Sequence, residues 1–224
     1  MTRVAPAAVV LLLMTPIGAN AQVALVEDVN SKSAGVQSMD YVVSGKQIRL
    51  GNQDTLVLSY LKSCWRETIV GGTVTVGAEQ SDVQGGHVER QKVDCDGDRL
   101  ILTAQQASQS AGMVVRGLVE SKPAVPEPEV TLFGTSPLVE IKDGGVIVLE
   151  RLDQPGERQR IDAGKQQLVK GAFYDFARAN KTLVPGGVYR ASTGARQIVF
   201  KIDPGAKLGT SPILGRLLRL QPVT

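Results

Sequence analysis

Few residues of this sequence have the types and spacing that acid–base, nucleophilic or metal chemistry requires. His87 is the only histidine, so any Ser-His-Asp or Cys-His site would have to use it. It follows two glycines, its near neighbours are charged, and the chain has no G-x-S-x-G elbow. We therefore interpret His87 as a solvated turn residue, and we predict neither catalytic residues nor a cofactor.

Three carboxylates alternate along the chain at Asp94, Asp96 and Asp98. Calcium loops use this spacing, but here the glycine falls in the fourth position rather than the sixth, and the twelfth position is Gln105 rather than glutamate. An acidic hairpin turn is the favoured interpretation, with calcium binding as the alternative. A zinc site would need several histidines or reduced cysteines, so we predict no metal site.

Cys64 and Cys95 are the only two cysteines. In an exported protein such a pair is most simply a structural disulfide, which stabilises a domain by about 3–4 kcal/mol for a loop of this length. A redox pair is the alternative, but it usually needs a C-x-x-C arrangement, which is absent. We expect Trp65 to pack in the core beside the disulfide, with a ligand platform as its alternative role.

Residues 1–21 are typical of a secretory signal peptide. Arg3 supplies the positive charge, residues 4–14 are mostly apolar, and Ala19-Asn20-Ala21 fits the cleavage rule. An uncleaved anchor is the alternative. No later segment approaches the length of a membrane span. We therefore expect a periplasmic protein that does not span the membrane after cleavage.

The composition favours an all-β chain with many turns, because it has 24 glycines, 11 prolines and few long helical periods. The formal charge of +3 implies neither nucleic acid nor an acidic polymer as a partner. Aromatic residues make up only 4% of the chain, which argues against a stacking platform for sugars or bases.

The chain is organised around residues 47–76. Strands are expected at residues 47–50, 55–61 and 73–76, with turns at Gly51-Asn52 and Gly71-Gly72. The run from Ser44 to Gly51, the apolar ladder after it, the glycine turn and the second ladder together resemble the FecR-like periplasmic β-domain over residues 35–105. The resemblance implies a β-domain at residues 22–119. FecR proteins carry a regulatory segment and a membrane helix upstream, which this chain lacks, so their sigma-factor role is not expected.

Further strands are expected at residues 99–103, after a hairpin turn at Asp96-Gly97, and at 113–119. Residues 120–129 contain three prolines and three glutamates. Proline favours an extended backbone, so we place a linker and the domain boundary here.

The second half predicts strands at residues 130–133, 138–141, 146–152, 158–161, 167–169 and 197–202, with one or two helical turns at 172–179. Leu183, Pro185, Gly186 and Tyr189 form an L-x-P-G-x-x-Y run that is similar to the tyrosine corner of fibronectin type III and immunoglobulin-like sandwiches. There the tyrosine hydroxyl bonds to the backbone just upstream and the leucine packs beneath it. The resemblance implies a sandwich at residues 130–203.

The tail at residues 204–224 has leucines at helical spacing (Leu214, Leu217 and Leu218). It is expected to pack on its own domain, with docking to a membrane protein or lipid surface as the alternative. The sequence thus predicts two small β-domains on a proline-rich linker. The expected function is non-enzymatic: protein–protein interaction or a sensor-accessory role in the bacterial envelope, with an envelope or inner-membrane protein as partner. The alternative is an enzyme acting on envelope polysaccharide or peptidoglycan, or a ligand-binding protein.

Overall fold

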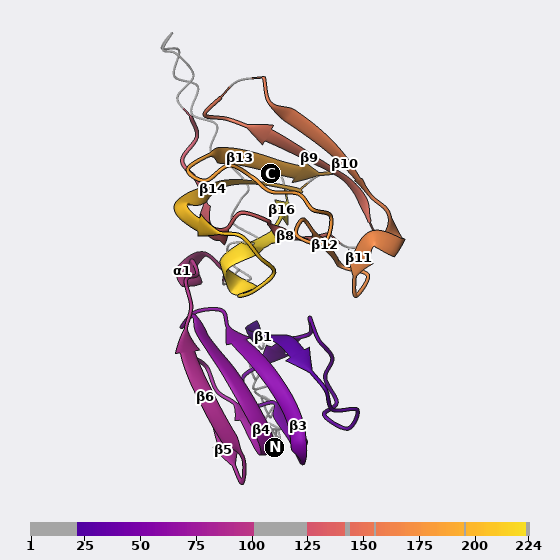
Figure 1. Cartoon of the computed structure of the whole chain (residues 1–224), viewed down its shortest axis with the longest axis vertical. Helices are drawn as coiled ribbons and strands as arrows, with labels where there is room; N and C mark the ends of the chain where they lie inside the picture. Colours follow the sequence, from indigo (N-terminus) through magenta and orange to yellow (C-terminus); the bar gives the residue numbers. More distant parts are fainter. Residues whose placement is uncertain (1–21, 101–124, 142–143, 155, 195, 223–224) are drawn as a thin grey trace, which may run out of the picture.

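The computed structural model describes residues 22–100, 125–141, 144–154, 156–194 and 196–222, and these form an all-β chain. Their strands lie in three sheets, which Figure 1 shows as two bodies: the first sheet below, in indigo to magenta, and the other two above, in orange to yellow. The predicted fold class is confirmed. The expected strand at residues 113–119 and most of the expected linker lie outside the described residues.

The first body is one antiparallel sheet built from residues 22–92. The strand order is β2-β1-β3-β4-β5, and β6 continues along the same edge of β4 as β5. The strands are β1 (Gln22–Val29), β2 (Tyr41–Val43), β3 (Gln47–Tyr60), β4 (Trp65–Val76), β5 (Ser81–Gln84) and β6 (His87–Lys92).

The long strands β3 and β4 correct two of the expected turns. Gly51-Asn52 and Gly71-Gly72 do not reverse the chain, because each strand continues through them and only the register shifts, between Leu50 and Thr55. The reversal lies at residues 61–64, where Cys64 has a left-handed φ of 54°. Glycines at this point in the sequence therefore mark a bulge inside the sheet rather than its end.

The glycines are needed there because neighbouring backbones approach too closely for side chains. A Cβ on Gly72 would lie 2.5 Å from the carbonyl oxygen of Gln84, and one on Gly86 would lie 2.1 Å from that of Gly71. Gly85 and Gly86 lie between the end of β5 and the start of β6. The irregular pairing thus crosses three neighbouring strands.

The second body has a six-stranded and a four-stranded sheet. The larger has the order β10-β9-β13-β14-β16, with β7 parallel to β14, and the smaller has the order β11-β12-β8-β15. The larger comprises β7 (Val130–Gly134), β9 (Gly145–Arg151), β10 (Arg158–Ala163), β13 (Val188–Thr193), β14 (Arg196–Lys207) and β16 (Gln221–Pro222). The smaller comprises β8 (Leu138–Glu140), β11 (Leu168–Val169), β12 (Phe173–Asp175) and β15 (Leu217–Arg219), and single 3-10 turns lie at η1 (Lys165–Gln167) and η2 (Leu214–Arg216).

The helical turns expected at residues 172–179 are wrong. Phe173–Asp175 is strand β12, which pairs with β8 and β11. Phe173, Tyr174 and Phe176 are all buried, and Tyr174 meets Phe176 edge to face at 5.4 Å between ring centroids. Burial on both sides of this segment outweighs its helical composition.

The hairpin turn at Asp96-Gly97 is also wrong. The chain forms a single helical turn there, α1 (Gly97–Leu100), whose Leu100 is buried. The Asp96 carboxylate accepts the backbone N–H of Thr131 at 2.8 Å, so this turn connects the first body to the start of β7. Of the strand expected at residues 99–103, residues 101–103 lie outside the described chain.

Within the described ranges, three apolar clusters hold the fold together. One fills the first body, one fills the space between the two sheets of the second, and a third joins the bodies. The tail contributes to two of these clusters. Leu214 and Leu217 lie in the joining cluster, whereas Leu218 and Leu220 lie in the core of the second body, where β15 pairs in parallel with β8. The buried members of the joining cluster are Leu25, Met39, Leu61, Leu100, Leu138, Phe173, Leu214 and Leu217.

Candidate functional site

The predicted disulfide is confirmed. Cys64 and Cys95 are bonded, with their Cα atoms 5.8 Å apart, and the bond ties the β3–β4 turn to the segment after β6. Trp65 is half-buried against the core of the first sheet, and the Lys92 ammonium lies 5.1 Å from its ring centroid. The Trp65 ring is thus covered by its own neighbours.

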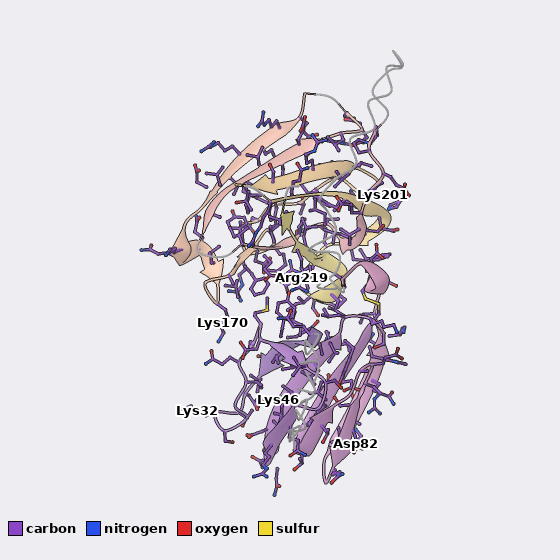
Figure 2. The ribbon with its side chains drawn as sticks, turned by 180° about the vertical axis from the view of Figure 1, so that it is seen from behind. Lys32, Lys46, Asp82, Lys170, Lys201 and Arg219 are labelled. Atoms are coloured by element: carbon purple, nitrogen blue, oxygen red, sulfur yellow. A yellow bond between two sulfur atoms is a disulfide. The ribbon has the colours of Figure 1, made fainter. Side chains whose placement is uncertain are left out.

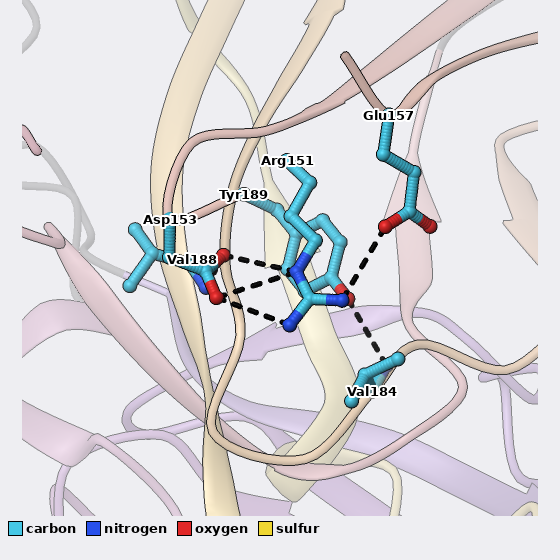
Figure 3. Close-up of polar contacts among 6 residues, drawn as sticks. All are labelled: Arg151, Asp153, Glu157, Val184, Val188 and Tyr189. Carbon is cyan, nitrogen blue, oxygen red and sulfur yellow. Dashed lines mark hydrogen bonds and ion pairs between the residues drawn. The ribbon is translucent and has the colours of Figure 1, made fainter. Parts of the chain in front are cut away.

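Tyr189 bonds to the backbone just upstream of it. Its hydroxyl accepts the N–H of Val184 at 3.0 Å (Figure 3), and Leu183 is buried in the sandwich core. Gly186 has a left-handed φ of 78°, and a Cβ on Gly187 would lie 2.7 Å from the Tyr189 ring. Pro185 and the two glycines therefore shape a loop that carries the chain from one sheet to the other.

Arg151 also contacts the ring of Tyr189. Its guanidinium lies 5.8 Å from the Tyr189 ring centroid and donates to Asp153 and Glu157 (Figure 3). Hydrogen bonds from Arg151 hold the pKa of Asp153 below its usual range against the opposing effect of burial. Asp153 in turn accepts the Val188 N–H at 3.0 Å, so this polar group fixes a corner of the fold.

The other sequence candidates do not converge. His87 begins β6 with its side chain 75% exposed, 4.0 Å from Glu89. Asp96 bonds to Thr131, as described above, and no group of three or more His, Cys, Asp or Glu residues suited to a metal ion occurs in the described part of the chain. The side chain of Asp98 lies outside the described residues, so the calcium alternative at Asp94–Asp98 stays a prediction.

Four buried or nearly buried carboxylates each accept a hydrogen bond from an arginine, and sequence reasoning missed all four pairs. The partners are 23 to 79 residues apart in the chain, so no local pattern could have found them. Paired in this way, the carboxylates are structural ligands of arginine rather than free acids or bases. The pairs are Glu27–Arg66 (2.8 Å), Glu67–Arg90 (2.7 Å), Asp175–Arg216 (2.9 Å) and Glu140–Arg219 (3.0 Å).

A groove of about 540 Å³ lies between the two bodies. One wall is β2 with the loop before it, and the other is the segment from Lys170 to Phe173 with Glu140. Tyr41 and Phe173 meet across it with ring centroids 6.4 Å apart. A second hollow of about 580 Å³ shares Gly35, Val36, Asp40 and Lys170 with the first, so the two are continuous.

Tyr41 is the polar centre of the groove. Its hydroxyl donates to Glu140 at 3.1 Å, and Arg219 lies 4.5 Å from its ring centroid. Burial, with the neighbouring Glu140 carboxylate, raises the pKa of the Tyr41 phenol well above its ordinary value. The phenol therefore keeps its proton, and Glu140 is already engaged by Tyr41 and Arg219. This arrangement suits binding better than proton transfer.

An enzyme that used acidic residues of both bodies would need a cleft near the proline-rich linker at residues 120–129. The described linker residues 125–129 line neither hollow of the groove nor the two smaller cavities, of about 130 and 310 Å³, beside the tail. Arg216 lines both smaller cavities, and Asp175, which is bonded to Arg216, lines the cavity of about 310 Å³.

No helix in the described ranges is long and apolar enough to cross a membrane. No protein-family model, curated protein or solved structure matches the chain.

Proposed function

We propose that this chain is an exported, non-enzymatic module of a bacterial envelope that binds another protein, as an interaction or sensor-accessory component. The groove between the two bodies carries this proposal. It is open, it draws its walls from both bodies, and its buried carboxylate is occupied by Tyr41 and Arg219. A disulfide and a leader-like segment at residues 1–21 agree with export to the periplasm.

We also propose that the first body is FecR-like and that the second is an immunoglobulin- or fibronectin-type sandwich. The strand order of the second body supports this. Its sheets place β9, β13 and β14 side by side opposite β8 and β12, which is the division between the CFG and BE strands of such sandwiches. The bond from Val184 to Tyr189, at the crossing between sheets, adds to that support.

The partner we propose is an envelope or inner-membrane protein. The test is reversible crosslinking in the native envelope, affinity capture of the tagged mature protein, and mass spectrometry of the captured material. We expect one reproducible protein partner that is absent from an untagged control. Recovery of the protein alone, or with polysaccharide, would contradict the proposal and favour the enzyme or ligand-binding alternative.

A further inference from the structure

The first sheet has two very different edges. At one edge, β6 exposes a charged run of both signs from His87 to Lys92, a composition that discourages strand pairing. At the other edge, β2 consists of Tyr41, Val42 and Val43. Among the described residues β2 pairs only with β1. The second edge of β2 is therefore available and carries no charge of its own.

The available edge of β2 faces the groove, because all three residues of β2 line it. The floor is apolar: Val36, Met39 and Phe173 are each buried to 9% exposure or less. The opposite wall is formed by Lys170, Ala172 and Phe173, which come after β11, and by Glu140 of β8. An extended segment lying here would meet a strand on one side and apolar side chains beneath it.

The rim of the groove is basic. Lys32, Lys46 and Lys170 are exposed and line one hollow or both. Figure 2 shows Lys32 and Lys170 on one flank of the molecule, away from Asp82 and Lys201. Lys170 donates to the Gln37 side chain at 3.0 Å, which leaves two of its three N–H groups for a ligand.

The carboxylates of the groove do not cancel this charge. Glu140 is paired with Arg219 at 3.0 Å. Asp40 keeps its negative charge, but it is one carboxylate against the three lysines of the rim. The groove therefore presents an excess of positive charge above an apolar floor. The complementary ligand has acidic side chains toward the rim and apolar ones toward the floor, which alternate in an extended strand.

We propose that this groove binds an extended acidic segment of a partner protein, which pairs with the available edge of β2. This inference rests on the proposed function, and it names the site and the chemistry of the partner segment. The rim lysines supply charge recognition and the β2 backbone supplies strand pairing.

The test uses a fluorescein-labelled peptide of about eight residues, the length of a strand, with glutamate and valine alternating. Fluorescence anisotropy with the mature protein should show binding that weakens as salt is raised. A peptide of lysine and valine should not bind. Lys46→Glu with Lys170→Glu should weaken binding by about tenfold or more, whereas Lys201→Glu, on the other flank, should leave it unchanged.

Strand pairing is tested separately from charge by N-methylating alternate amides of the peptide. Methylation along one edge should abolish binding, and methylation along the other edge should preserve it, because only one edge faces β2. Equal binding of the two methylated peptides would overturn strand pairing. Binding to phosphatidylglycerol vesicles but not to the peptide would overturn the proposal in favour of a lipid surface.

The two proposals can fail independently. If crosslinking captures a protein partner whose crosslinks map away from β2 and Lys170, the groove is not the site, although the protein-binding function stands. If the peptide binds the groove but no protein is captured from the envelope, the site chemistry stands and the proposed function is contradicted.

Discussion

The two bodies of the molecule secure their irregular segments by different means. In the first, the β3–β4 turn is bonded covalently to the segment after β6, and the bulge is held by close backbone packing at glycines. In the second, arginine side chains reach between elements. Arg216 joins η2 to Asp175 at the end of β12 and to the Ser136 carbonyl before β8, and Arg151 braces the Tyr189 corner.

The difference predicts different vulnerabilities. A disulfide is indifferent to acid and sensitive to reductant, whereas an arginine–carboxylate pair has the opposite sensitivities. The first body also contains such pairs. Glu67 and Arg90, however, face each other on the paired strands β4 and β6, and backbone pairing already holds these strands together. The second body should therefore respond more strongly to loss of a charge.

The largest expected effect follows from removing the Asp175 carboxylate. Arg216 is 3% exposed and donates to both oxygens of Asp175, at 2.9 and 3.0 Å. Asp175→Ala leaves this cation buried without its partner, so we expect a loss of about 3–5 kcal/mol in the free energy of unfolding. Urea denaturation measures it. Arg178→Ala is the matched control, because Arg178 is 69% exposed and lies 3.8 Å from the same carboxylate; it should change stability by less than about 1 kcal/mol.

The same carboxylate gives a pH dependence. Burial alone would raise the pKa of Asp175, but hydrogen bonds and charge from Arg216 outweigh it and lower the pKa. The stabilisation is therefore fully present above the ordinary aspartate pKa of about 3.9 and is lost as the pH falls through the lower folded value. Asp175→Asn should flatten that part of the stability curve. An unchanged acid limb would contradict the assignment.

The second prediction concerns the disulfide. Cys64→Ser with Cys95→Ser should lower the free energy of unfolding by about 3–4 kcal/mol in the chain-entropy account. Hydrogen exchange should rise first in β3, β4 and β6, and the fluorescence of Trp65, the only tryptophan, reports the same region. If exchange rises equally in β9 and β13, the bodies unfold as one unit and do not differ in how they are stabilised.

Sequence reasoning predicted what depends on local pattern. The all-β class and the disulfide follow from composition and from a single possible cysteine pair. The errors lie where tertiary contacts decide. Gly71-Gly72 has turn composition but lies inside a sheet, and the segment containing Phe173–Asp175 has helical composition but is paired on both sides.

The candidate site was largely beyond the reach of the sequence. Tyr41, Glu140 and Arg219 meet although they are separated by 99 and 79 residues, and none of them belongs to a recognisable motif. Charge pairing over such separations is set by how the bodies pack. The Tyr189 run was visible because its residues are adjacent in the chain.

The third prediction tests the glycine bulge of the first body. Gly86→Ala would place a Cβ 2.1 Å from the Gly71 carbonyl oxygen, and backbone cannot move aside as a side chain can. We expect a loss of about 2 kcal/mol or more, measured by thermal and urea unfolding. Gly85→Ala is the control, since a Cβ on Gly85 would meet open space and Gly85 has a φ of 68°. This variant should lose only about 1 kcal/mol of stability, the cost of placing an L-residue at a left-handed φ. Equal losses would show that close approach is not the reason for Gly86.

The smallest expected effect is at the corner of the second body. Tyr189→Phe keeps the ring, which stacks on Phe200 with 5.7 Å between centroids, and removes only the acceptor of the Val184 N–H. Val184 is 47% exposed, so water can replace the lost partner, and we expect a loss of about 1 kcal/mol by urea denaturation. Tyr174→Phe is the control, because its hydroxyl has no partner in the described part of the chain; it should have a smaller effect. A loss as large as that of Asp175→Ala would mean that the bond between Val184 and Tyr189 stabilises the second body as much as the buried Asp175–Arg216 pair does.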